Sequence, residues 1–115
     1  MNPPPFIMVA DHGVLKAFAA GGCDRDLRLV NAIDISGSRN RPRDLYAGQI
    51  AGHVVNLLKA YQPSRWAFAA PAEINGAVLD RVSPQWLHSL QDNMKRDLHN
   101  EGPRALTRLF DRPVA

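Results

Sequence analysis

The chain is poor in the features that stabilise small folds covalently or anchor proteins in membranes. It has one cysteine, Cys23, so an internal disulfide is excluded, and no pair of His or Cys residues has metal-ligand spacing. We therefore expect no metal site and no cofactor. No apolar run approaches the roughly 20 residues of a membrane-spanning helix, and the N-terminus lacks the pattern of a signal peptide. These absences predict a cytoplasmic protein without membrane contact.

Two classes of enzyme lack their motifs in this sequence. Gly21 and Gly22 stand alone, without the longer glycine-rich pattern that surrounds the phosphates of a nucleotide. No serine lies in the strand-turn-helix elbow of a serine hydrolase. Asp11 and His12 are adjacent on a strand end, where side chains point to opposite faces, so we interpret Asp11 as a turn former.

Length and composition indicate one globular domain. The 115 residues, 45% apolar and 22% charged, are enough for a single hydrophobic core. We expect residues 1–5, with three consecutive prolines, to form a disordered leader and residues 6–112 to form the domain.

The first part of the chain has the pattern of three strands. Residues 6–10 form a short apolar run typical of a central strand, and residues 14–20 follow a tight turn as in a hairpin. Residues 27–35 alternate with period two, which predicts a third antiparallel strand with Leu27, Leu29, Asn31, Ile33 and Ile35 on one face.

The rest of the chain alternates helices and strands. Apolar residues at three- and four-residue steps predict helices over 44–59, 73–82 and from 103 onward, and the apolar run 65–70 predicts a buried strand. Residues 85–96 fit a helix or an edge strand, and we favour one helical turn followed by a strand over 89–96. The order is then βββαβαβα, an α/β (α+β) domain with a mixed sheet and helices packed on it.

Positive charge is concentrated in one predicted loop. The chain carries 14 Lys and Arg against 11 Asp and Glu, a net charge of +3, and residues 36–43 alone contribute +3. Guanidinium groups bind phosphate oxygens bidentately, and small polar neighbours let backbone amides approach. We predict an anion or nucleic-acid site made of Arg39, Arg41, Arg43, Ser38 and Asn40. The alternative is a solvated loop whose charges serve solubility.

A second basic group follows near the C-terminus. Its members are Lys95, Arg96, Arg104 and Arg108, together with His99. This group could extend a nucleic-acid footprint, or it could be an ordinary charged helix face.

An ordered set of short motifs runs through the chain. Val9-Ala10-Asp11, Lys16-Ala17-Phe18, Ala69-Ala70-Pro71 and Lys95-Arg96-Asp97-Leu98 surround the basic loop and the long helix. Together they resemble the bacterial host-attachment protein family, whose members are related to the middle domain of archaeal and eukaryotic peptide-chain release factors. The resemblance covers about residues 6–110. It implies a release-factor-like, ribosomal-protein-like fold and a role with the ribosome, rRNA or tRNA.

Release factors of that class carry a Gly-Gly-Gln motif for peptidyl-tRNA hydrolysis. The corresponding segment here holds Gly48-Gln49, with Ala47 in place of the first glycine. Ala resists the backbone angles that glycine adopts, and the dipeptide lies inside a helical apolar period. Gln49 is thus a weak catalytic candidate, and we do not expect an enzyme.

Three hypotheses follow in order of preference. The first is a non-catalytic RNA- or ribosome-associated module that uses the basic loop. The second is a protein-interaction module with an acidic partner, and the third is a peptidyl-tRNA hydrolase with a degenerate Gly-Gln motif. A homodimer that covers a free sheet edge is compatible with each of them.

Overall fold

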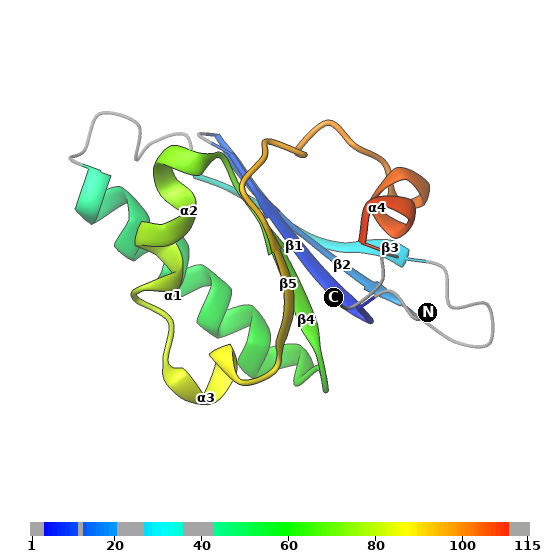
Figure 1. Cartoon of the computed structure of the whole chain (residues 1–115), viewed down its shortest axis with the longest axis horizontal. Coiled ribbons are helices and arrows are strands. Elements are labelled where there is room, and N and C mark those ends of the chain that lie inside the picture. Colours follow the sequence, from blue (N-terminus) through cyan, green and yellow to red (C-terminus); the bar gives the residue numbers. More distant parts are fainter. Residues whose placement is uncertain (1–3, 12, 21–26, 36–42, 111–115) are drawn as a thin grey trace.

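The computed structural model describes residues 4–11, 13–20, 27–35 and 43–110. Within these residues the elements are β1 (Phe6–Ala10), β2 (Val14–Ala20), β3 (Leu27–Asp34), α1 (Arg43–Tyr61), β4 (Trp66–Ala69), α2 (Ala72–Leu79), α3 (Pro84–Leu87), β5 (Leu90–Met94) and α4 (Pro103–Phe110). The predicted α/β class is confirmed, because the strands form one mixed sheet with helices packed on it (Figure 1).

The sheet has the order β3-β2-β1-β4-β5. Strands β1, β2 and β3 pair as an antiparallel meander, with Met8 opposite Ala17. On its other side, β1 pairs in parallel with β4, with Met8 opposite Phe68, and β4 pairs in parallel with β5. All five residues of β1 are buried, which agrees with the prediction that this apolar run is a central strand.

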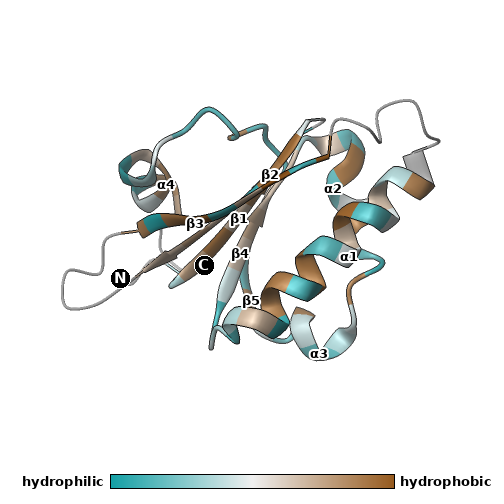
Figure 2. Cartoon of the chain, turned by 180° about the vertical axis from the view of Figure 1, so that it is seen from behind, coloured by the Kyte–Doolittle hydropathy of each residue, from teal (hydrophilic) through white to brown (hydrophobic). Residues whose placement is uncertain are grey.

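Helices cover both faces of the sheet. Figure 1 shows α1 and α2 on one side of the strands and α4 on the other. Figure 2 shows apolar and polar residues alternating along α1, as expected of a helix with one face against a sheet. The fold therefore has three layers, and each face of the sheet has its own hydrophobic cluster.

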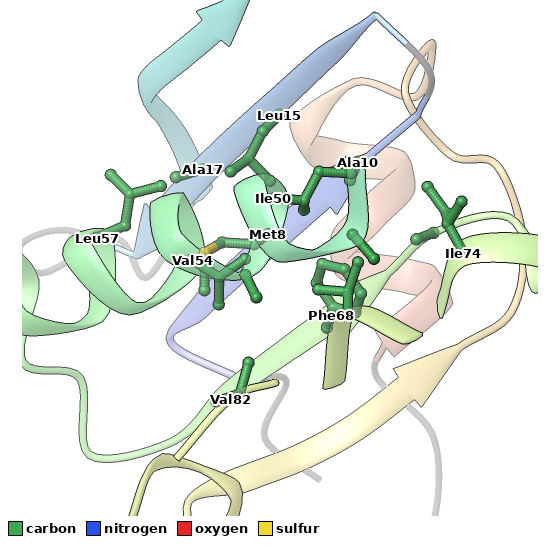
Figure 3. Packing of buried hydrophobic residues seen from close by; sticks show 14 of the residues in the cluster. Met8, Ala10, Leu15, Ala17, Ile50, Val54, Leu57, Phe68, Ile74 and Val82 are labelled. Carbon is green, nitrogen blue, oxygen red and sulfur yellow. The ribbon is translucent and has the colours of Figure 1, made fainter. Parts of the chain in front are cut away.

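The larger cluster lies between the sheet and the α1–α2 layer. Figure 3 shows Met8 and Phe68 from the sheet packed against Ile50 and Val54 of α1. Trp66 is fully buried in the same cluster, and its indole N–H donates a hydrogen bond of 2.8 Å to the Trp86 carbonyl. This bond links the start of β4 to α3.

The smaller cluster lies under α4. Leu106 and Phe110 are both buried and pack with residues of the opposite sheet face, among them Val9, Phe18 and Leu27. The helix is short, so its position depends on these two anchors.

Strand β3 differs from its predicted alternation. The pairing with β2 shifts between Ala17, opposite Asn31, and Phe18, opposite Leu29, which leaves Val30 as the extra residue of a bulge. A one-residue bulge exchanges the faces of the strand on its two sides. Leu27 consequently joins the α4 cluster, whereas Ile33 and Ile35 join the α1 cluster, so the expectation of one common face was wrong.

The helix boundaries in the structure differ from the predicted ones by a few residues. Helix α1 continues to Tyr61, and Gln62 ends it with a φ of 44°, in the left-handed region. Helix α2 ends at Leu79 and not at residue 82, because the amides of Arg81 and Val82 bond to carbonyls three residues earlier and form a tight turn. For residues 85–96, the predicted helical turn followed by a strand is confirmed by α3 and β5.

Candidate functional site

Several strands end at one edge of the sheet. β1, β4 and β5 run parallel, so their carboxyl ends at Ala10, Ala69 and Met94 lie on the same side. β3 ends there too, because Asp34 pairs with Val14 at the start of β2. In open α/β sheets this edge is where ligands usually bind, and we call it the carboxyl edge.

Asp11 is the first polar side chain at the carboxyl edge. Its Oδ1 accepts hydrogen bonds from the amides of Gly13 and Val14, each 2.7 Å long, which confirms its predicted role as a turn former. Its backbone carbonyl accepts a 2.7 Å bond from the Tyr46 hydroxyl of α1. The second carboxylate oxygen, Oδ2, lies 3.3 Å from Nδ1 of His99.

Asp97 and His99 reach the same place from the segment between β5 and α4, drawn in orange in Figure 1. Nδ1 of His99 lies 2.5 Å from Oδ1 of Asp97, and the His99 amide donates to that same oxygen over 3.1 Å. Leu98, between them, is buried in the α4 cluster. This apolar anchor holds the two polar side chains at the surface of the edge.

Lys16 secures the segment from the sheet. Its Nζ donates a 2.9 Å hydrogen bond to the backbone carbonyl of His99. The two residues are 83 positions apart in the sequence, so this contact exists only in the folded chain.

A buried amide pair stabilises the neighbouring part of the edge. Asn75 of α2 is fully buried, and its side-chain amide donates to Oδ1 of Asn93 and to the carbonyl of Met94, over 2.8 and 3.0 Å. Asn93 returns a 2.8 Å bond to Oδ1 of Asn75. The end of β5, from which the 95–99 segment departs, is thereby tied to α2.

The Asp11–Asp97–His99 cluster has a defined chemical capacity. One ligand atom from each residue lies within 4.8 Å of the other two. The exposed fractions of the side chains are 14% for Asp11, 46% for Asp97 and 29% for His99, so solvent and small ions can reach the cluster. Two carboxylates facing one imidazole can share a proton on the histidine or can bind a cation.

The predicted basic loop is only partly placed. Ser38, Arg39, Asn40 and Arg41 lie outside the described residues, and Arg43 begins α1 with a side chain that is not described. The ends of the loop are well defined, however. The amide of Ile35, after β3, donates a 3.0 Å bond to the Gly13 carbonyl, and Tyr46 in α1 contacts Asp11. Both flanks therefore lie at the carboxyl edge.

The second basic group does not form one patch. Lys95 and Arg96 are exposed directly after β5, at the carboxyl edge. Arg104 and Arg108 are exposed on α4, which packs on the other face of the sheet. The first two residues follow β5 and the other two lie on α4, and their joint binding of a nucleic acid stays a prediction.

Gln49 lies within α1 and is half-buried, as the helical pattern of the sequence predicted. Gly48 precedes it in the helix, where a Cβ would lie 3.8 Å from Cδ of Arg81. The dipeptide is thus continuous helix, and it differs in this respect from a glycine-rich loop.

Sequence reasoning missed Asp97 and the convergence of His99 with Asp11. The available signal was the Asp-x-His spacing directly after a predicted strand, at the same sheet edge as Asp11. Metal-ligand motifs in a sequence are recognised by short spacings, whereas these three residues are brought together by parallel pairing of distant strands.

The fold is similar to that of RuvC in two solved structures. A structure of Thermus thermophilus RuvC matches with a TM-score of 0.52 and 17% identity, and it covers 95% of this chain and 84% of the RuvC chain. A second structure, of T. thermophilus RuvC in complex with a Holliday junction substrate, matches with a TM-score of 0.51 and 18% identity over the same shares. At these identities the likeness shows the fold alone.

No protein-family model and no curated protein sequence matches the chain. Within the described residues, the helices are too short or too polar to cross a membrane.

Proposed function

We propose that the protein is a non-catalytic RNA-binding module that holds the phosphate backbone against the carboxyl edge of its sheet. The observation that carries the proposal is the position of the basic loop's flanks. Ile35 and the first turns of α1 lie beside Asp11, so the segment with Arg39, Arg41 and Arg43 starts and ends at this edge.

Further positive charge lies at the same edge. Lys95 and Arg96 are exposed where β5 ends, and Lys16 contacts the segment that follows them. Lys16, Lys95 and Arg96 thus add three described cationic residues to the edge from which the segment with the predicted loop arginines departs. Phosphate contacts of this kind supply most of the sequence-independent affinity of nucleic-acid-binding proteins.

Two likenesses support a nucleic acid as the ligand. One of the solved structures with this fold holds a nucleic-acid substrate, a Holliday junction. The motifs that resemble the host-attachment family, and through it the release-factor middle domain, favour RNA, with tRNA, rRNA or the ribosome as the partner.

Binding of a short fluorescent RNA, measured by anisotropy over a series of salt concentrations, tests the proposal. We expect affinity to fall with salt, and the triple change R39A/R41A/R43A to weaken binding. The plot of log affinity against log salt should become shallower, with the magnitude of its slope smaller by about 2. Each of the three lost phosphate contacts contributes about 0.7 on single strands.

The matched control removes three arginines away from the carboxyl edge. Arg65, Arg104 and Arg108 are exposed before β4 and on α4, so R65A/R104A/R108A makes the same change in net charge. Equal loss of affinity in the two triple variants would mean that only net charge matters and would refute the edge as the site.

Capture of partners from cell extract, with and without nuclease, separates RNA binding from the protein-interaction hypothesis. If the partner is an acidic protein, capture from cell extract survives nuclease treatment but is lost at high salt. Capture that nuclease abolishes, together with co-sedimentation with ribosomes, is the result we expect for an RNA-binding module.

A further inference from the structure

We propose that Oδ2 of Asp11, Oδ1 of Asp97 and Nδ1 of His99 form a binding site for one divalent transition-metal ion, with Zn²⁺ or Mn²⁺ as the class of ion. The residues come from the end of β1 and from the 95–99 segment, and one ligand atom of each lies within 4.8 Å of the other two. Nδ1 of His99 lies 3.3 Å from Oδ2 of Asp11 and 2.5 Å from Oδ1 of Asp97. The inference goes beyond RNA binding, because an ion can occupy the site with no RNA present.

The ligand chemistry selects the class of ion. Mg²⁺ and Ca²⁺ prefer sites made of oxygen atoms alone, whereas an imidazole nitrogen suits Zn²⁺, Mn²⁺ and other transition metals. Two carboxylates and one histidine leave at least one coordination position of such an ion open. The open position faces solvent, because Asp97 and His99 are both partly exposed.

The distances are close to those of an occupied site. Zinc bonds to oxygen and nitrogen of about 2.0–2.2 Å place tetrahedral ligand atoms about 3.3–3.6 Å apart. The distance between His99 Nδ1 and Asp11 Oδ2 is already 3.3 Å. The contact with Asp97, at 2.5 Å, is shorter than an ordinary hydrogen bond, so Asp97 must retreat by about 1 Å to admit an ion.

Asp97 is the most exposed of the three ligands, at 46%, and its Oδ1 also accepts a hydrogen bond from the His99 amide. Asp11 is held through Oδ1 by two backbone amides, which leaves Oδ2 directed at the site. The backbone of His99 is held by the bond from Lys16. Ligands that hydrogen bonds hold in place before the ion arrives lower the entropic cost of binding.

The charge balance gives the ion a role at an RNA-binding edge. Asp11 and Asp97 place two formal negative charges where phosphate would approach, and they would repel it. A dication on these carboxylates removes that repulsion and offers its open position to a phosphate oxygen. A proton held on His99 would neutralise only one of the two charges.

Titration calorimetry on chelator-treated full-length protein tests the site with metal salts alone. We expect one Zn²⁺ per chain, weaker binding of Mn²⁺ and no measurable binding of Mg²⁺. Because carboxylate and imidazole ligands must be deprotonated to bind an ion, Zn²⁺ affinity should weaken as the pH falls. Lack of Zn²⁺ binding would overturn the proposal.

Near-isosteric variants assign the ligands. Asp11→Asn keeps the oxygen that accepts the turn amides, and Asp97→Asn changes the most exposed ligand, so both should fold. With His99→Gln, each is expected to lower Zn²⁺ affinity by about 100-fold. Unfolding midpoints without metal check the folding of each variant.

The matched controls are Asp80→Asn, at the far end of α2, and His88→Gln, after α3, both at exposed residues. They should leave Zn²⁺ affinity unchanged. If the site variants bind Zn²⁺ as tightly as the controls do, the ion is bound elsewhere and the assignment is wrong. Metal binding that persists while RNA binding fails would refute the proposed function and leave this inference intact.

Discussion

Asn75 and Asn93 exchange two side-chain hydrogen bonds of 2.8 Å, so that each amide is donor and acceptor to the other. Asn75 is fully buried in α2, and Asn93 lies in β5. The pair fixes the end of β5 next to α2 and thereby sets the starting point of the segment that carries Asp97 and His99. A polar contact inside the molecule thus determines the geometry at its surface.

We expect Asn75→Ala to lower the free energy of unfolding by about 2–4 kcal/mol, because Asn93 and the Met94 carbonyl each lose a buried partner. Urea unfolding of both proteins measures the difference. Asn56→Ala, at an exposed position of α1, is the control and should change stability by less than about 0.5 kcal/mol. Similar effects of the two changes would show that the amide pair contributes little.

Tyr46→Phe should cost about 1–2 kcal/mol, because it removes the 2.7 Å bond from the hydroxyl to the Asp11 carbonyl and keeps the buried ring. Tyr61→Phe is the matched change at an exposed residue whose hydroxyl lies 3.4 Å from its acceptor. Thermal unfolding of both variants and of the native protein measures the two losses of stability. A loss at residue 61 as large as that at residue 46 would contradict the importance of the Asp11 contact.

Leu106→Ala tests how α4 is held on the sheet. The side chain is fully buried in the smaller cluster, and its truncation should reduce stability by about 2–5 kcal/mol. Leu45, 57% exposed on α1, provides the control, and Leu45→Ala should be nearly neutral. Hydrogen exchange of the α4 amides should become faster in Leu106→Ala and stay unchanged in Leu45→Ala. Unchanged exchange in Leu106→Ala would show that α4 docks on the sheet independently of Leu106.

Gln49→Ala examines the hydrolase hypothesis. Gln49 is half-buried in continuous helix, so we expect peptidyl-tRNA hydrolysis by the native protein to stay at the background rate, with no change in the variant. The assay follows release of the labelled peptide from peptidyl-tRNA. Turnover by the native protein that the substitution removes would establish Gln49 as catalytic.

Much of the fold could be predicted because local patterns and tertiary packing agree. The apolar run of β1 is central, the turn at Asp11 joins the hairpin, and the three- and four-residue spacing of α1 places Ile50 and Val54 in the core. The bulge at Val30 could not be predicted, because the sequence there continues to alternate while the pairing with β2 shifts.

The candidate site was predictable in part. Charge counting along the chain located the arginines of residues 36–43 without reference to any contact. The second basic group comes from two elements, because Lys95 and Arg96 follow β5 whereas Arg104 and Arg108 lie on α4. Neither the sign nor the number of charges indicates how such elements lie in the fold.

The sequence by itself determined the local features of this protein: which segments are strands or helices, where turns fall, and where positive charge gathers. These depend on periodicity and composition, which act over a few residues. Only the tertiary structure decided that Asp11 and His99 lie 3.3 Å apart. Their proximity results from parallel pairing of β1, β4 and β5 and from the bond of Lys16 to the His99 carbonyl, and such long-range contacts leave no periodic trace in the chain.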